Sequence, residues 1–521
     1  MATSFLVSCQ KEDNLDIVQI DDLESIDVLN DNTILGKQLE NPYSVENMRK
    51  ALAELKSSNA LKSSFIDDDF EIETTHLYVR FLPKNEEELN LLKQDTLLHF
   101  YDYPLDYEIV SPGICYHDPT LPDTVITWQY TVVAPDYNFP TITHEILSEL
   151  FLIEEKDEDS NLKSATVNIP FWDMLEDKAL EITGNLDETN ISGAVLKASK
   201  WRPAGTITVY DDIIGGNIPL VGAMVRARRW FTTHKGYTDN SGNFSCDGRF
   251  RRDANYNIKW ERNYWDIRSG TWGQALYNGP KKRGNWNLAI TSGKSLHYAT
   301  IHRAAYRHFY GNNLGMYRPY GAANGRWKIC YYDKNGTGDF WGNIGGSGLL
   351  PDIRIYGNSG SSKSVSDVFR TTAHELGHAA HCANMGNIQF WQVSKIIYES
   401  WADAVEWALT NQEYDELGAI YSSSVVNNLN KQSWPYAGNS KGYTSLFIDL
   451  VDNYNQSTRN TTSRTYPNDN VTGYTMSNLS RNIVPKSYGL SSLKSKLKAN
   501  KPSGVTDTQI DELFIRYEEE W

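Results

Sequence analysis

Cysteine is scarce in this chain, with five in 521 residues. They stand at Cys9, Cys115, Cys246, Cys330 and Cys382. Because they are widely spaced and form no CxxC pair, the sequence predicts neither a disulfide framework nor a cysteine-based zinc knuckle. No run of about 20 apolar residues occurs, so no bilayer-spanning helix is expected. Histidine is also limited: there are 11, and none follows His381.

Positive charge is in deficit, and the deficit is uneven. Residues 1–190 carry 39 Asp and Glu against 12 Lys and Arg, a net charge of −27, whereas residues 191–521 carry 27 against 38, a net charge of +11. Two interpretations are open: the acidic and basic parts face each other, or each is a solvated surface. The basic residues are scattered and accompany no recognition motif, so we expect no nucleic-acid partner.

Hydrophobic residues make up 40% of the chain and charged residues 22%, which excludes disordered, collagen-like and coiled-coil classes. The length predicts roughly three domains of about 150 residues each. The pattern favours a multidomain α+β protein with an N-terminal α/β domain, a central β-sandwich and a mainly helical C-terminal domain. The expected segments are a tether at 1–45, the α/β domain at 46–160, a connector at 161–194, the sandwich at 195–285 and the C-terminal domain at 286–521.

Hydrophobic periodicity gives the elements within these segments. Helices are expected at 47–61, 86–93, 144–152, 171–180, 295–310, 364–382, 393–409 and 445–454. Strands are expected at 76–82, 128–133, 205–210, 223–229, 327–332 and 350–356. The turn residues at 239–242 predict a hairpin between apolar flanks.

One helix carries an HExxH motif, His374-Glu375-Leu376-Gly377-His378. A spacing of four places both imidazoles on one helical face, so both can reach one ion. Glu375 lies beside them, where it could take a proton from a bound water. Ser364 and Asp367 predict a capped start for this helix.

A hydrolytic zinc site needs a third protein ligand and one open position. A further histidine in the HExxHxxGxxH pattern is excluded, because His381 and Asn384 stand where that pattern needs Gly and His. Glu399 lies 21 residues after His378 on the next expected helix, and Asp403 follows one turn later. Asp403 could bond the outer nitrogen of a liganding histidine. His381 is expected to be a packing or rim residue.

The HExxH and ExxxD pair resembles the gluzincin, or thermolysin-like, zinc metallopeptidases. The resemblance implies Zn²⁺ as cofactor, His374, His378 and Glu399 as its ligands, Glu375 as catalytic base and Asp403 as the outer partner. It also implies that the strand at 350–356 is the edge strand that binds an extended peptide substrate. Such enzymes use a Tyr and a downstream His to stabilise the oxyanion of the tetrahedral intermediate. Because this chain has no downstream His, Tyr443, Tyr436 or an Arg would serve, or zinc would act largely alone. The GxMEN motif of related aminopeptidases is absent, which favours an endopeptidase.

Two further resemblances concern the rest of the chain. Segments in 205–244, including Pro219-Leu220-Val221-Gly222-Ala223, resemble the transthyretin-like or carboxypeptidase-regulatory-like β-sandwich, usually a structural or binding module. The stretch from Ser4 to Cys9 and the polar run behind it resemble the lipoprotein box and surface-export signal of Bacteroidetes lipoproteins. A lipid anchor on Cys9 at the bacterial outer membrane or cell surface, or secretion, is therefore expected. Only eight residues precede Cys9, so either the true start lies upstream or the match is chance.

Two functions follow. The first is a zinc-dependent surface protease, and the second is a non-catalytic lipoprotein that binds protein or glycan on a peptidase scaffold. The intact Glu375 favours the first. The charge difference also suggests that the N-terminal domain covers the catalytic cleft as a pro-domain.

Overall fold

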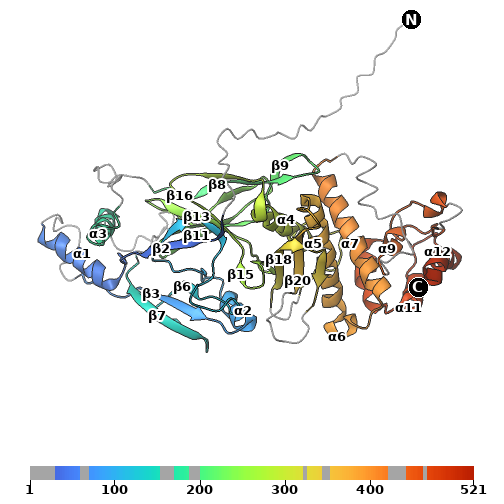
Figure 1. The fold of residues 1–521 in the computed structure, drawn as a ribbon, viewed down its shortest axis with the longest axis horizontal. Helices are drawn as coiled ribbons and strands as arrows, with labels where there is room; N and C mark the ends of the chain where they lie inside the picture. The colour runs from blue at the N-terminus through green and yellow to red at the C-terminus, as the bar shows by residue number, and fades with distance from the viewer. Residues whose placement is uncertain are drawn as a thin grey trace, which may run out of the picture.

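The chain is a multidomain α+β protein, as expected. The computed structural model describes residues 30–58, 70–152, 169–186, 200–320, 325–342, 352–419, 442–460 and 466–520. It is elongated, with the N-terminal elements at one end, the β-rich part in the middle and the long helices α4, α5 and α7 followed by the C-terminal helices at the other end (Figure 1). In the described part of the chain, no helix is long and apolar enough to span a membrane.

The N-terminal part is built on a small antiparallel sheet. Its central strand β3 (His76–Leu82) pairs with β6 (Gln129–Val133) on one side and β7 (Thr143–Leu150) on the other. Helix α1 (Val45–Ser57) packs against α3 (Ile169–Ile182), and α2 (Glu86–Gln94) follows β3. The expected helices at 47–61, 86–93 and 171–180 are thus confirmed where they fall on described residues, and the strands at 76–82 and 128–133 are also confirmed.

The helix expected at 144–152 is wrong, because these residues form strand β7. The strand is mostly exposed, and Ile146 and Leu147 keep 55% and 40% of their surface accessible. The apolar spacing that resembled a helix therefore does not mark a buried face. Pairing of β7 with β3, which is bulged between Tyr78 and Val79, decides the conformation.

Part of the expected tether also belongs to the folded structure. Strand β1 (Asn30–Asn32) pairs with β5 (Gly113–Cys115), and β2 (Ile34–Gln38) pairs with β4 (Tyr107–Ser111). Cys9 lies outside the described residues, so the lipid anchor stays a prediction.

The middle of the chain forms two sheets, as expected for a sandwich. One has the order β11 (Thr232–Tyr237), β10 (Met224–Arg229), β13 (Ala254–Lys259) and β16 (Leu276–Lys282). The other has the order β12 (Asn243–Ser245), β8 (Ala204–Asp211) and β17 (Trp286–Ile290), with β9 (Gly216–Pro219) paired to β8. The strands expected at 205–210 and 223–229 are confirmed.

The turn at 239–242 is present, but it does not close a hairpin. Asp239 Oδ1 accepts hydrogen bonds from the backbone of Ser241 and Asn243, both at 2.9 Å. The flanking strands β11 and β12 belong to different sheets, so the turn passes the chain from one layer of the sandwich to the other.

The strands of the sandwich and of the C-terminal sheet interleave around residue 285. The C-terminal sheet has the order β15 (Gly273–Gln274), β14 (Trp265–Ser269), β18 (Trp327–Asn335), β20 (Ile353–Asn358) and β19 (Gly338–Phe340). It takes β14 and β15 from before residue 285, whereas β17 from after it pairs with β8 of the sandwich. One apolar core accordingly includes Ile207, Trp265, Ile329 and Leu376.

The expected edge strand is not at the edge. The strand predicted at 350–356 corresponds to β20, which lies between β18 and β19. The edge belongs to the short β19, which runs antiparallel to β20. Its three residues lie next to a glycine-rich stretch and carry little strand signal of their own.

Helices α4 (Gly293–Phe309), α5 (Val365–Met385) and α7 (Lys395–Glu416) confirm three predicted helices and pack together beside this sheet (Figure 1). The helix expected at 445–454 is shortened to α9 (Leu446–Asp449). The remaining short and C-terminal elements are α6 (Asn387–Phe390), η3 (Gln456–Arg459), α10 (Met476–Asn478), η4 (Leu479–Ile483), η5 (Val484–Lys486), α11 (Leu490–Ala499) and α12 (Asp507–Glu520).

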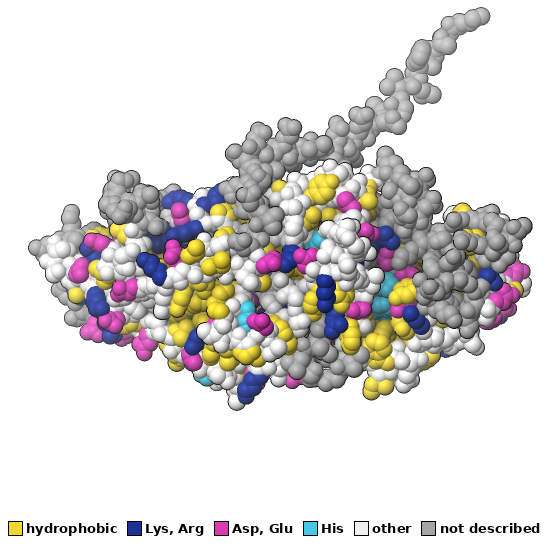
Figure 2. Space-filling view, viewed as in Figure 1, with side chains coloured by type: hydrophobic (Ala, Val, Ile, Leu, Met, Phe, Trp, Pro, Cys, Tyr) yellow, Lys and Arg dark blue, Asp and Glu magenta, His cyan; other side chains and the backbone are white. Residues whose placement is uncertain are grey.

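Buried and half-buried ion pairs join the acidic first part of the chain to the basic remainder. Glu86 on α2 accepts from Lys328 Nζ at 2.6 Å and from Arg268 Nη2 at 3.2 Å. Asp177 on α3 accepts from Arg251 at 2.5 Å. On the face drawn in Figure 2, acidic and basic side chains are interspersed over the described surface. These contacts favour the interpretation in which the two parts face each other.

Candidate metal site

Helix α5 positions the HExxH motif. It begins as predicted, because the Ser364 side chain caps the helix by accepting from the Asp367 backbone N–H at 3.1 Å. Val368 and Leu376 are fully buried on its apolar face. The rings of His374 and His378 lie one turn apart, with centroids 4.8 Å from each other.

Helix α7 brings the third predicted ligand beside these rings. The two helices meet closely at Gly377, where an added Cβ would lie 3.1 Å from Val405 Cβ and 3.2 Å from Ala402 Cα. Glu399 Oε2 lies 3.3 Å from His374 Nε2 and 3.2 Å from His378 Nε2. The structure therefore brings His374, His378 and Glu399 together, with one donor atom of each within 4.8 Å of the others.

The donor set fits a zinc ion. Two imidazole nitrogens and one carboxylate are a common ligand set of hydrolytic zinc sites and leave one position open. Donors bound tetrahedrally at about 2.0–2.1 Å stand about 3.3 Å apart, which matches the two distances from Glu399 Oε2. All three side chains are buried, with 5–8% of each residue exposed.

The electrostatics of these three residues are coupled. Burial alone would raise the pKa of Glu399, but hydrogen bonds from His374 and His378 hold it well below its usual range. Burial lowers the pKa of His378. Burial also lowers the pKa of His374. Hydrogen bonds to Asp403, Glu399 and Glu406 outweigh this effect and raise the pKa well above its usual value.

A second layer of carboxylates orients His374. Its Nδ1 lies 3.2 Å from Asp403 Oδ1 and 3.4 Å from Glu406 Oε2. Glu406 in turn accepts from Arg370 Nε at 2.9 Å. A proton on Nδ1 shared with these carboxylates leaves the Nε2 lone pair free for a metal.

Asp403 is placed as predicted, whereas Glu406 and Arg370 were missed. Glu406 lies seven residues after Glu399 and so on the same helical face, and Arg370 lies one turn before His374. The helical spacing could have found both.

Glu375 lies beneath the edge strand. The residue is 5% exposed, and a Cβ added to Gly338 of β19 would lie 2.3 Å from Glu375 Oε1. The backbone of the sheet edge therefore runs directly over this carboxylate. Burial raises the pKa of Glu375 to about 8, with His374 acting in the opposite direction and the carboxylates of Glu399 and Asp339 adding to the increase.

Tyr443 is also brought to the site. Its ring faces that of His374 at a centroid distance of 6.1 Å. The Ser400 hydroxyl of α7 accepts from the Thr444 backbone N–H at 3.1 Å and donates to the Gly442 carbonyl at 3.0 Å, which ties this segment to the helix carrying Glu399. Burial and the Glu399 carboxylate raise the pKa of Tyr443. Tyr436 lies outside the described residues.

His381 is not part of the cluster. Its ring packs edge-on against Phe390 at a centroid distance of 5.2 Å, and burial lowers its pKa to about 3. The Val484 backbone acts on this pKa in the opposite direction, but burial outweighs it. It is a buried neutral packing residue, as expected.

Comparison with protein-family models and with curated proteins found no family and no relative that matches this chain.

Proposed function

We propose that the chain is a zinc-dependent metallopeptidase that hydrolyses internal peptide bonds. The observation that carries the proposal is the convergence of His374 Nε2, His378 Nε2 and Glu399 Oε2 from two helices, with Glu375 beside them. This is the arrangement that the resemblance to gluzincins implies. His374, His378 and Glu399 would hold the metal, and Asp403 and Glu406 would fix the tautomer of His374.

When bound, zinc supplies a Lewis acid that lowers the pKa of water and polarises the scissile carbonyl. Glu375 is the group that moves the proton. One oxygen of its carboxylate takes a proton from the attacking water and delivers it to the amide nitrogen, which leaves as an amine. Its burial keeps bulk water from competing for that proton.

The edge strand β19 would position the substrate. In the described part of the chain, β19 pairs with β20 on one side and with no strand on the other. A peptide in extended form could add to this edge through main-chain hydrogen bonds, which would carry its backbone past Glu375. The absence of a GxMEN sequence favours an internal bond over an N-terminal one.

Tyr443 would stabilise the oxyanion. A phenol is protonated at neutral pH and donates one hydrogen bond. Its ring faces His374 and its phenol bonds the Glu399 carboxylate, so the hydroxyl lies beside the residues that would hold the metal and would donate to the developing oxyanion.

The alternative is a binding protein that keeps this scaffold without catalysis. Attachment to the bacterial surface through a lipid on Cys9 would suit either function and stays part of the proposal.

Metal analysis together with a peptide-library cleavage assay tests the proposal. We expect about one zinc per chain, cleavage by the wild type, and loss of cleavage with retained zinc in Glu375→Gln. Stoichiometric zinc without cleavage in the wild type would support the binding alternative. Absence of bound zinc in wild type refolded with excess metal would overturn the proposed metallopeptidase.

A further inference from the structure

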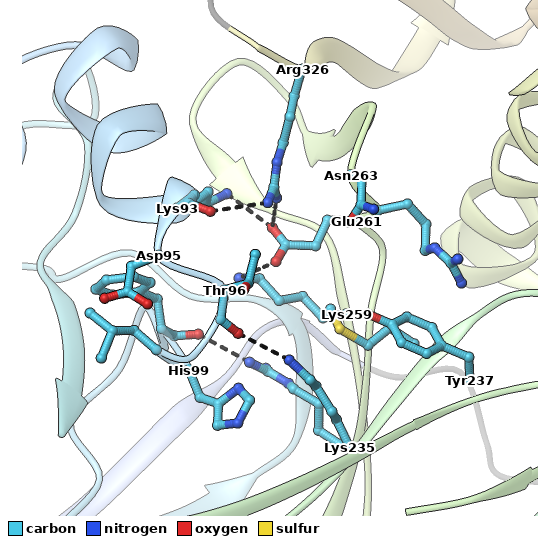
Figure 3. Close-up of a pocket in the computed structure, with 15 residues that line it drawn as sticks. Lys93, Asp95, Thr96, His99, Lys235, Tyr237, Lys259, Glu261, Asn263 and Arg326 are labelled. Carbon is cyan, nitrogen blue, oxygen red and sulfur yellow. Dashed lines mark hydrogen bonds and ion pairs between the residues drawn. The ribbon is translucent and has the colours of Figure 1, made fainter. Parts of the chain in front are cut away.

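A polar cavity whose lining includes no residue of the candidate metal site lies where three parts of the chain meet. Its volume is about 100 Å³. Its walls come from Lys93 near the end of α2 and the residues that follow up to Phe100, from strands β10, β11 and β13 with residues 261–263, and from Arg326 just before β18. Figure 3 shows these side chains pointing toward one another from the different parts of the chain. The N-terminal part, the sandwich and the C-terminal sheet therefore all contribute to it.

Positive charge dominates the lining. The bases are Lys93, Arg226, Lys235, Lys259, Arg262 and Arg326. The carboxylates that line it are Asp95 and Glu261. Six bases and two acids give the lining a clear positive excess.

Glu261 neutralises only part of this charge. Its carboxylate contacts Lys259 Nζ at 2.9 Å, Lys93 Nζ at 3.1 Å and Arg326 Nη1 at 3.2 Å (Figure 3). One negative charge is thus shared among three bases. Lys93 has a second partner in Asp266 at 2.5 Å, but Asp266 is itself shared with Arg268.

Three further bases have neutral partners. Lys235 Nζ donates to the Thr96 carbonyl at 3.2 Å, and Arg262 Nη1 donates to the Gly222 carbonyl at 2.6 Å.

Arg226 is the most buried of these, with 2% of its surface exposed. It donates to Asn257 Oδ1 at 2.8 Å and to the Phe100 carbonyl at 3.0 Å, and it lies over the Tyr101 ring. A guanidinium in this position satisfies its hydrogen bonds but not its charge.

Burial and the neighbouring bases act together on the pKa of two groups at the cavity, Lys259 and His99. Burial, together with Lys93 and Arg226, lowers the pKa of Lys259 to about 8, although Glu261 acts in the opposite direction. Burial, with Lys235 and Arg226, lowers the pKa of His99 to about 3. A buried excess of positive charge is costly unless a counter-charge offsets it.

We propose that this cavity binds a small oxyanion of the phosphate or sulfate type. The space suits one such ion or a few water molecules, and guanidinium and ammonium groups are the donors that proteins use for tetrahedral oxyanions. Lys259 and Arg226 supply the buried charge, and Lys235 and Arg262 stand at the wall. Because the walls come from three parts of the chain, the bound anion fastens the N-terminal part to the rest.

Thermal unfolding and calorimetric titration of the full chain test this proposal without any use of the metal site. The probes are sodium phosphate and sodium sulfate, with sodium chloride at equal ionic strength as the reference. Phosphoserine is the second arm, because it separates a free ion from an oxyanion group on a larger ligand. We expect a saturable rise of several degrees in Tm with phosphate or sulfate and none with chloride.

Variants locate the site. We expect Lys259→Met to raise the Kd at least tenfold and Lys235→Gln to raise it severalfold, whereas Lys84→Gln, an exposed lysine outside the cavity, leaves it unchanged. If Lys259→Met fails to fold, the half-buried Lys235 decides the matter. The absence of a saturable effect in wild type, or an equal Kd in wild type and Lys235→Gln, would overturn the proposal.

Discussion

Gly338 on the sheet edge leaves no room for a side chain above Glu375, since an added Cβ would lie 2.3 Å from Glu375 Oε1 and 2.8 Å from Thr371 Cγ2. The edge strand and the proposed catalytic base are therefore packed as one unit. A displacement of either changes where a bound peptide lies relative to the carboxylate.

Gly338→Ala is expected to reduce kcat/KM for peptide cleavage by about 10- to 100-fold, because a displacement near 1 Å can cost that much. Zinc content should stay near wild type, since the ligands lie on α5 and α7. Gly216→Ala on β9 is the control, because nothing lies within 4 Å of its added Cβ. If Gly338→Ala cleaves peptides as well as the wild type does, the packing of β19 against Glu375 does not matter for catalysis.

His378 and His381 form a matched pair on one helix, and only His378 is a proposed ligand. We expect His378→Asn to weaken zinc binding by more than about 100-fold, because even loss of an outer partner costs about 10- to 100-fold. His381→Asn should retain zinc and lose stability instead. Chelator competition measures the affinity, and urea unfolding measures the stability. Equal zinc affinity in the two variants would contradict the assigned ligand set.

Glu406 tests the second layer of the site. Glu406→Gln removes a negative charge beside His374 Nδ1, so we expect zinc affinity to fall by about tenfold with cleavage specificity unchanged. Glu416→Gln on the same helix is the control, because its pair with Arg307 lies at the surface, where ion pairs contribute little. Should both variants bind zinc as the wild type does, Glu406 would serve only to hold Arg370.

The sequence predicted most of the candidate site because its signals are local. The pairs His374–His378 and Glu399–Asp403 each follow the helical repeat, and the cap at Ser364 marks where α5 begins. These features depend on residues within a few turns of one another. The approach of Glu399 to the two imidazoles and of Tyr443 to His374 depends on packing between segments, which the local pattern does not contain. The metal stays a prediction.

The misses share a long-range cause. The conformation of residues 143–150 depends on pairing with β3, some 70 positions away in the chain, rather than on their own hydrophobic periodicity. The exchange of β14 and β17 between neighbouring sheets has the same origin, and so does the identity of the edge strand. Pairing partners of this kind leave no mark in a local hydrophobic pattern.

The partly buried carboxyl of Asp352 makes stability depend on pH. Burial raises its pKa to about 7, although the Lys328 backbone N–H, donating at 2.9 Å, acts in the opposite direction. Between the ordinary Asp pKa and this value the folded state holds the proton and the unfolded state does not, so stability falls as pH rises, by at most about 1.4 kcal/mol per unit. The side chain of Asp352→Asn cannot ionise but keeps an oxygen that accepts from the Lys328 backbone N–H. We therefore expect the free energy of unfolding of this variant, measured in urea, to increase relative to that of the wild type as the pH rises from 5 to 7. Asp123 is exposed, so the stability of the control variant Asp123→Asn should depend on pH as that of the wild type does. If stability changes with pH equally in wild type and Asp352→Asn, Asp352 is already ionised at pH 5.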